Sequence, residues 1–312
     1  MSQDPPKCAT CGTEAMLQCA GCIDAPAYQS NDSKTIVYCN SDCQKKHRPT
    51  HKAHCNSMAH RRKLHRTAIV LKAAVLTYRA VNYDIDLTKL ELRDGVLLLH
   101  HRPRASTDST KRAPFPSNLT DNIEYKEAAL TVNQCTAANA LSGRLARKLL
   151  VDVPSKMETL DLHIGKPALP TKLIPGADST QCPHTVLKVE LLRSQETWVI
   201  DTTGRQYGFR EVLVPYAEYV AEKECRIVGP PAGYFATETK DLDFFLTLPF
   251  MTGTKAQRDG LEVERRHRMG FASFVDTAVE KGILHGSVVR FGGKLEGFKG
   301  ELRAHLLQVT GR

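Results

Sequence analysis

Apolar residues recur every three or four positions between residues 57 and 81, which is the period of an α-helix. The apolar stripe consists of Leu64, Ala68, Leu71, Val75 and Tyr78. The polar positions of this segment begin with a basic run, made of Arg61, Arg62, Lys63 and Arg66. The pattern predicts an amphipathic helix, and its basic run is typical of a solvated face or of contact with an acidic partner.

Apolar runs and alternating positions predict strands further along the chain. Residues 85–99 contain Asp94-Gly95 between apolar runs, which indicates a β-hairpin. Further strands begin at His184 and at Thr197, with a polar turn between them. Because strands joined by a short turn pair antiparallel, we expect the start of the first to meet the end of the second.

Further helices are predicted near Asn133, from Pro215 and over residues 261–284. The helix near Asn133 presents one apolar face, made of Leu141, Leu145 and Leu149. The four residues from Arg265 to Arg268 are expected on a solvated turn. Residues 102–118 and 160–182 are rich in Pro, Gly or polar residues and predict irregular chain.

Cysteines divide the chain unevenly, because seven of the ten lie within the first 55 residues. Together with one histidine they form four pairs of soft donors, namely Cys8 and Cys11, Cys19 and Cys22, Cys39 and Cys43, and His51 and Cys55. Tetrahedral zinc takes four N or S ligands, so eight donors suit two closed structural sites. A segment this short buries few apolar residues, so metal binding would supply most of its folding energy. The neighbouring His47, His54 and His60 compete with His51 as ligand candidates.

This ligand string resembles the MYND-type zinc finger, on the two CxxC pairs, residues 38–44 and residues 51–55. The resemblance implies that the first and third pairs hold one zinc ion and that the second and fourth pairs hold the other. It also implies a module for protein–protein interaction. The family usually has Trp at the position of Arg48, an aromatic residue that often lines its peptide groove.

Composition places the whole chain among intracellular proteins of two parts. The 312 residues carry a net charge of +9, with 43 Lys and Arg against 34 Asp and Glu, which permits an acidic partner without requiring one. No apolar run is long enough to span a bilayer, and the N-terminal residues lack the apolar core of a secretory signal. We therefore expect a reducing, cytoplasmic or nuclear location and no membrane partner. The expected parts are a finger at 1–56, a basic linker helix at 57–82 and an α+β domain at 83–312.

Three residues of the larger part suggest thiol chemistry. Cys135 is expected in the first turn of its helix, where the macrodipole favours a thiolate. His184 opens one predicted strand and Asp201 closes the next, so the carboxylate is expected to reach the imidazole. In such a triad His184 would deprotonate Cys135, and Asp201 would orient the imidazole.

The order of these residues resembles that of transglutaminase-like and papain-like thiol enzymes, over residues 120–225. The resemblance implies a helix bearing the cysteine packed on an antiparallel sheet, and attack of the thiol on an amide or ester carbonyl. Thr136 stands where many members carry a large aromatic residue, and Thr185 stands where Trp is common. Cys182, two residues before His184, is a rival thiol. A cysteine in such a helix is also often only a small core residue.

Three functional hypotheses follow from the sequence. The first is an interaction protein whose zinc finger docks a protein partner. The second is a thiol-dependent amide or ester hydrolase or acyltransferase that uses Cys135, His184 and Asp201. The third is a transcriptional or chromatin-associated regulator, in which the basic run contacts nucleic acid. Nucleotide-binding classes lose their usual support, because neither a GxGxxG after a strand nor a GxxxxGK[ST] motif is present.

Overall fold

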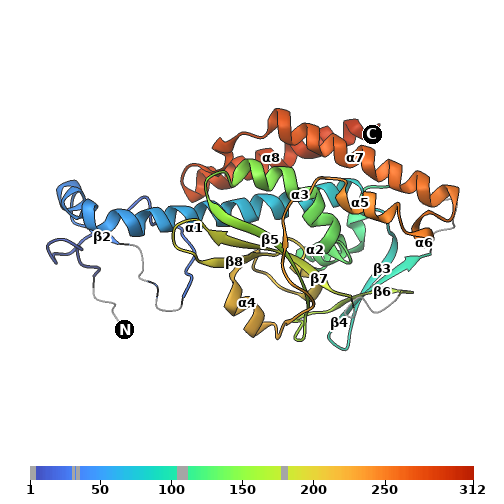
Figure 1. The fold of residues 1–312 in the computed structure, drawn as a ribbon, viewed down its shortest axis with the longest axis horizontal. Helices are drawn as coiled ribbons and strands as arrows, with labels where there is room; N and C mark the ends of the chain where they lie inside the picture. The colour runs from blue at the N-terminus through green and yellow to red at the C-terminus, as the bar shows by residue number, and fades with distance from the viewer. Residues whose placement is uncertain (1–4, 30–31, 33–35, 104–111, 177–181) are drawn as a thin grey trace.

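The computed structural model describes residues 5–29, 32, 36–103, 112–176 and 182–312 (Figure 1). Its longest element is helix α1, Ser41–Val81, which leaves the body of the molecule and reaches the N-terminal cysteine-rich segment. The helix begins at Asn40, whose side chain accepts a hydrogen bond from the Cys43 N–H at 2.9 Å. It therefore starts well before residue 57, where the apolar period begins, and contains Pro49. The predicted boundary at residue 56 lies inside this one helix.

The apolar stripe of α1 is buried along its whole length, as its period predicts. The stripe packs in a core that also receives residues from helix α3, Cys135–Leu149, and from the main sheet. Beside the outer end of α1, strands β1, Leu17–Gln18, and β2, Val37–Tyr38, pair antiparallel.

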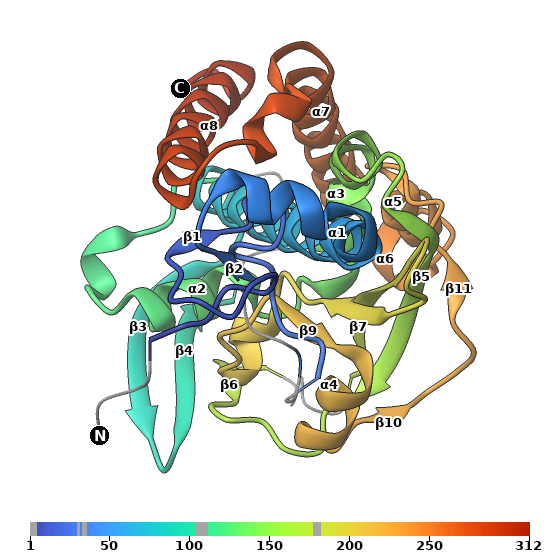
Figure 2. The same ribbon diagram turned by 90° about the vertical axis from the view of Figure 1, so that its left-hand side faces the viewer.

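The main sheet has the order β10-β5-β7-β8-β9, and its neighbouring strands pair antiparallel. Its strands are β5, Pro154–His163; β7, His184–Leu191; β8, Thr197–Ile200; β9, Leu213–Pro215; β10, Arg226–Ile227; and β11, Ala232–Gly233, which also pairs with β5. Consecutive residues of β7 face opposite sides of the sheet. Leu187 packs in the core with α1 and α3, whereas Val186 packs in the cluster that contains Tyr219. Tyr219 belongs to helix α4, Tyr216–Glu222, so helices cover both faces of this sheet (Figure 2).

A smaller sheet has the order β3-β4-β6 and lies beside helix α2, Ile123–Thr131. Strands β3, Asp86–Arg93, and β4, Val96–Arg102, form the predicted hairpin. Asp94 and Gly95 both have positive φ, 52° and 75°, which is the backbone of a type I′ turn. Strand β6, Thr171–Ile174, pairs parallel with β4.

Helices near the C-terminus form an outer layer over α1 and α3 (Figure 1). The layer is formed by α7, Lys255–Ala278, and α8, Val288–Val309, and two short helices, α5, Lys240–Phe245, and α6, Pro249–Thr252, precede it along the chain. Helix α8 is rich in glycine, and it buries a stripe made of Phe291, Phe298, Leu302 and Leu306. Arg268 is buried between Glu264 and Asp241, so the prediction of a solvated turn is wrong at that residue.

The predicted α+β class is confirmed, with one correction in the sheet. Residues 160–182 were expected to be irregular, but residues up to His163 continue β5 and Thr171–Ile174 form β6. Leu160 and Leu162 are both buried at alternate positions, and this burial outweighs the turn-forming residues that follow. Of the predicted loop at 102–118, residues 104–111 lie outside the described part. Among the described residues, none of the helices combines the length and apolarity that crossing a bilayer requires.

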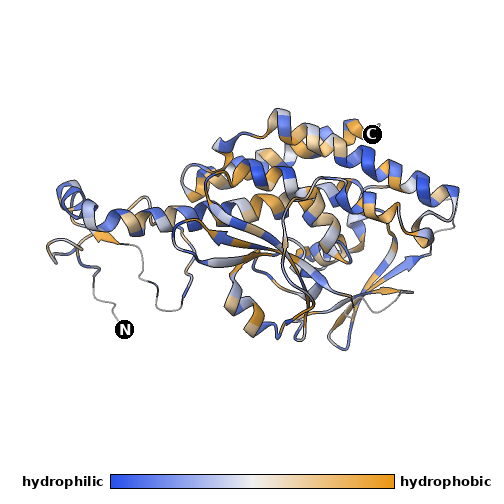
Figure 3. Ribbon diagram, viewed as in Figure 1, coloured by the Kyte–Doolittle hydropathy of each residue, from blue (hydrophilic) through white to orange (hydrophobic). Residues whose placement is uncertain are grey.

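Coloured by hydropathy, the ribbon shows apolar residues concentrated where the helical layer meets α1 and the main sheet, and polar residues along the outer turns of α7 (Figure 3). The outer end of α1 is mixed in character and carries only short apolar stretches. The cysteine-rich segment therefore depends on its cysteine and histidine donors more than on an apolar core.

Candidate functional site

The first group of metal donors consists of Cys8, Cys11, Cys39 and Cys43, whose sulfur atoms all lie within 4.8 Å of one another. The Cys11 sulfur is 3.5 Å from that of Cys39 and 3.8 Å from that of Cys43. Cys43 sits in the first turn of α1, so the cap at Asn40 fixes one donor directly. Loops and the β1–β2 pair position the remaining donors.

The second group consists of Cys19, Cys22, His51 and Cys55, also within 4.8 Å of one another. The Nε2 atom of His51 lies 3.3 Å from the sulfur atoms of both Cys19 and Cys22. His51 and Cys55 stand one turn apart on α1, as their spacing predicts. Within the described residues, His47, His54 and His60 lie outside both groups, and the Nδ1 atom of His47 is 3.0 Å from the Tyr38 hydroxyl.

The spacing between donors fits tetrahedral zinc. Zn–S bonds of about 2.3 Å place two sulfur ligands roughly 3.8 Å apart. The observed sulfur–sulfur distances of 3.5–3.8 Å match that edge and are far too long for disulfide bonds. The two groups pair first with third and second with fourth, as the resemblance implies, so both ions would have four protein ligands. Such closed sites are structural, because no coordination position remains for water or substrate.

A cluster around the thiol of Cys135 forms where three elements of the main domain converge. Cys135 is the first residue of α3 and is half-buried, His184 is the first residue of β7 and Asp201 follows the last residue of β8. The Nε2 atom of His184 lies 3.0 Å from Oδ2 of Asp201, and both side chains are buried. The antiparallel pairing of β7 with β8 produces this contact, as predicted from the sequence.

The thiol and the ring influence each other electrostatically. Burial raises the pKa of the Cys135 thiol, but hydrogen bonding to His184 and its charge bring that pKa below the ordinary value. Burial lowers the pKa of His184, while the Asp201 carboxylate and the Cys135 thiol raise it to about 10. The arrangement therefore favours a thiolate beside an imidazolium.

Further side chains, not singled out in the sequence, hold this cluster. The Tyr219 hydroxyl donates to Oδ2 of Asp201 at 2.7 Å, and the Thr203 N–H donates to Oδ1 at 3.1 Å. The Gln206 amide nitrogen is 3.4 Å from Nδ1 of His184, and its carbonyl oxygen accepts from the Asn133 N–H at 3.1 Å. Gln206 belongs to the short 3₁₀ helix Gly204–Tyr207, and no motif or periodicity marks it in the sequence.

The other two cysteines of the domain have different surroundings. Cys182, the rival thiol, is exposed. Cys225 is half-buried, and burial raises the pKa of its thiol to about 11. Among the three, Cys135 is the one whose thiol pKa is lowered by a buried imidazole, and its sulfur lies 3.9 Å from the Pro183 carbonyl oxygen and 4.0 Å from the Thr136 hydroxyl.

Comparison with known proteins identifies one segment. Residues 8–55 match the family model described as the MYND finger. This segment is a MYND finger. Its two donor groups fit two zinc ions, and MYND fingers generally mediate protein interactions. Neither the curated proteins nor the solved structures gave a match to the chain, so the resemblance of residues 120–225 to thiol enzymes stays a prediction.

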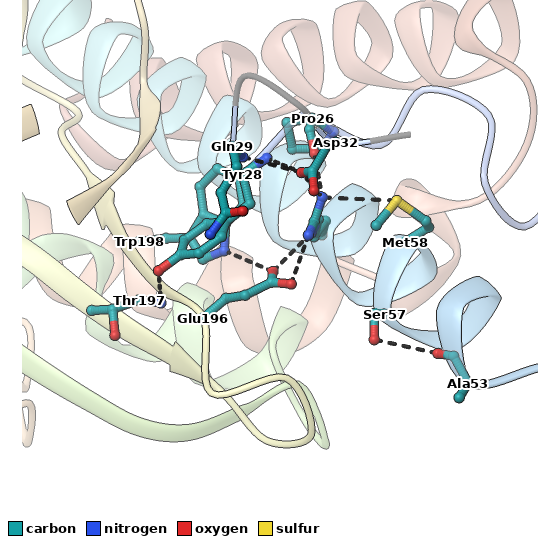
Figure 4. A network of polar contacts seen from close by, with 11 residues as sticks. Pro26, Tyr28, Gln29, Asp32, Ala53, Ser57, Met58, Glu196, Thr197 and Trp198 are labelled. Atoms are coloured by element: carbon teal, nitrogen blue, oxygen red, sulfur yellow. Dashed lines mark hydrogen bonds and ion pairs between the residues drawn. The ribbon is translucent and has the colours of Figure 1, made fainter. Parts of the chain in front are cut away.

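The MYND finger is joined to the domain by more than helix α1. Two nitrogens of Arg61, Nε and Nη2, donate to the Glu196 carboxylate at 2.8 and 2.7 Å, and Nη1 donates to Asp32 of the finger at 2.6 Å (Figure 4). The Tyr28 ring of the finger packs on Trp198 of β8, with centroids 5.2 Å apart. Trp198 also donates to Glu196 through its indole N–H at 3.4 Å.

The remaining side chains of the basic run are engaged in the same junction. Arg62 donates to the carbonyl oxygens of Ala20 and Ile23, and Lys63 donates to that of Val151. Arg66 donates to the carbonyl oxygens of residues 284 and 286 at 2.8 Å each. The four basic side chains thus have partners within the protein, and contact of this run with nucleic acid stays a prediction.

Proposed function

We propose that this chain is a thiol-dependent hydrolase or acyltransferase acting on an amide or ester, and that its MYND finger recruits the protein partner. The observation that carries the proposal is the buried pair of His184 and Asp201, at 3.0 Å, together with the Cys135 thiol, whose pKa the imidazole lowers. Asp201 occupies Nε2 of His184, so proton transfer would pass through Nδ1, which also lies 3.4 Å from the Gln206 amide nitrogen. The position of Cys135 at the start of α3 adds the helix macrodipole in favour of the thiolate.

The proposed reaction begins when the Cys135 sulfur attacks the carbonyl carbon of the substrate. The His184 imidazolium then gives its proton to the departing amine or alcohol, and a thioester to Cys135 remains. Water or an acceptor amine attacks the thioester while the neutral imidazole takes its proton, and the thiolate leaves. Asp201 stabilises the imidazolium throughout, and Tyr219 holds the Asp201 carboxylate by donating to it.

Alkylation with iodoacetamide at pH 7, followed by peptide mass spectrometry, tests the proposal. Cys135 should react faster than the exposed Cys182 and much faster than Cys225, because its pKa is lowered. His184→Ala should slow Cys135 by at least about tenfold, since burial without the imidazole raises the thiol pKa. His100→Ala, which alters a half-buried histidine on β4, is the matched control and should leave all three rates unchanged. Equal rates for Cys135 and Cys182 would overturn the proposal.

The pH at which the Cys135 thiol becomes reactive shows whether its pKa is lowered. Cys135 should become reactive below the pH at which an ordinary thiol ionises, near 8.5. In His184→Ala its reactivity should instead rise only in alkaline solution.

A second measurement detects chemistry directly, because p-nitrophenyl acetate should leave an acetyl group on Cys135 that Asp201→Asn diminishes. Acetylation spread equally over the three cysteines of the domain would contradict a dedicated nucleophile.

An interaction protein without catalysis is the second candidate, and the closed zinc sites of the MYND finger favour it. In that case the thiol cluster would only brace the junction of α3, β7 and β8. The acetylation experiment separates the two candidates, because a structural cluster would not accumulate a thioester.

A further inference from the structure

Helix α1 has a second apolar face, which lies between α2 and α8. A cavity of about 780 Å³ lies over this face, between α1, α2, α8 and the segment 210–213, whose last residue begins β9 of the main sheet. Figure 2 shows α1 between α8 and α2 on this side of the molecule. Its floor is a helical stripe made of Ile69, Ala73, Leu76 and Ala80. Ile123 and Leu295 line its walls, and the volume falls within the range of small-molecule sites.

The cavity is long. Its α1 lining runs from His65 to Ala80, which at 1.5 Å per residue spans about 22 Å. An extended peptide would lack partners for its backbone groups, because the floor and two walls are helices whose own N–H and C=O groups are already paired.

Charge at one end of the cavity selects the polar group of the occupant. Three lining cations have carboxylate partners, since Lys72 pairs with Glu127, Arg210 with Glu124 and Lys299 with Glu296. Two others, Lys126 and Arg303, have no ion pair among the described residues. One lining carboxylate, Glu211, also has no ion pair among the described residues, so these two cations exceed the unpaired lining anions by one charge.

Both of these cations lie toward the Ala80 end. The Lys126 ammonium is 5.7 Å from the centroid of the Phe115 ring, and the Phe115 N–H donates to the Ala80 carbonyl at 2.9 Å. Helix α8 begins near Arg66, which lies 5.0 Å from the centroid of the Phe291 ring, and runs in the same direction as α1 (Figure 1). Arg303, three turns beyond Phe291, is thereby carried toward Ala80.

We propose that this cavity binds a single-chain amphiphile with an anionic head group, such as a free long-chain carboxylate. The apolar chain would lie along Ile69, Ala73 and Leu76, and the head group would meet Lys126 and Arg303. The proposal does not depend on thiol chemistry, because the cavity and the Cys135 cluster are separate sites.

Calorimetric titration of the zinc-loaded full chain with laurate tests the proposal. Laurate should bind at least about tenfold more tightly than dodecyltrimethylammonium, which has the same chain and the opposite charge. Butyrate should not bind measurably, because it buries little apolar surface. Equal affinity for the anionic and the cationic amphiphile, or no binding of laurate, would overturn the proposal.

Variants locate the binding. Ala73→Phe should fill the floor and abolish laurate binding, whereas Ala304→Phe, on the exposed face of α8, should leave it unchanged. Leu295→Trp fills the cavity from the opposite wall, so agreement between the two filling variants rules out loss through misfolding. The double variant Lys126→Gln and Arg303→Gln should weaken laurate binding by about tenfold and leave binding of neutral dodecyl maltoside unchanged. Wild-type affinity in both filling variants would show that laurate binds elsewhere and would overturn the proposal.

Vesicles separate a free ligand from a bilayer. Cosedimentation with phosphatidylserine vesicles should be the same for the wild type and for Ala73→Phe, because the cavity takes a free chain. Cosedimentation that Ala73→Phe abolishes would instead indicate acyl chains drawn from a bilayer, which contradicts a site for a free amphiphile.

Discussion

Gly21 lies between the two cysteines of the second CxxC pair and shows how closely the zinc site is packed. A Cβ at this position would overlap the sulfur of Cys55. That sulfur cannot retreat without leaving its place among the donors of the second site. The glycine is therefore required because a side chain has no space there. A positive φ, which is the usual reason for glycine in a turn, is not involved.

Gly21→Ala should release one of the two zinc ions. Elemental analysis of the purified variant should return about one zinc per chain, against about two for the wild type. Ala20→Ser, at the exposed neighbouring position, adds a side-chain atom without reaching Cys55 and should keep both ions. Retention of both ions in Gly21→Ala would show that the site can widen, contrary to its packing.

Residues with a distinctive local context could be placed from the sequence alone. The zinc ligands could be placed because their spacing is itself the signal. The contact of His184 with Asp201 could be placed because it follows from two strands and a short turn. Gln206 and Tyr219 could not be, because each reaches the cluster from an element whose position only the tertiary fold determines.

At the scale of elements, β8 joins the two parts of the chain. Glu196 precedes its first residue and holds Arg61 of α1, and the two residues are 135 positions apart. From the sequence we expect Arg61 on a solvated or nucleic-acid-binding face, because a run of basic residues does not reveal an ion-pair partner that is distant in the chain. Helix α8 has only a weak signal in the sequence for a different reason, since its glycines lower the helical propensity that its buried apolar stripe overrides.

Arg61→Leu should destabilise the protein by about 3–5 kcal/mol, because it leaves the Glu196 carboxylate buried without its partner. Urea unfolding followed by circular dichroism measures the change. Arg61→Leu combined with Glu196→Leu should recover much of the loss, since the buried carboxylate is removed and the partly exposed Asp32 keeps its hydrogen bonds from the Tyr28 and Gln29 N–H groups. Lys52→Leu, at an exposed position of α1, should change stability by less than about 0.5 kcal/mol. A single variant as stable as the wild type would contradict the role of the junction.

At the scale of the whole molecule, the MYND finger is bound into the domain and not merely tethered to it. Helix α1 runs from the zinc donors into the main core, and Tyr28 of the finger lies against Trp198, at the start of the strand that Asp201 follows. The second zinc site is the nearer one to this contact, because Cys22 directly precedes the segment that leads to Tyr28. Loss of that ion should therefore disturb the packing of Tyr28 on Trp198 of β8, whereas loss of the first ion should not.

Trp198 is the sole tryptophan of the chain, so its fluorescence reports on this coupling. It is fully buried, and Cys22→Ser should shift its emission to longer wavelength because release of the Tyr28 segment admits water. Zinc chelation should produce the same shift, while the far-UV circular dichroism of the domain persists, because its core lies beyond the finger. Cys11→Ser, in the first site, should lower the zinc content without moving the emission. An equal shift from both cysteine variants would show that the finger responds as one unit, and an unchanged emission in both would show that the finger and β8 are independent.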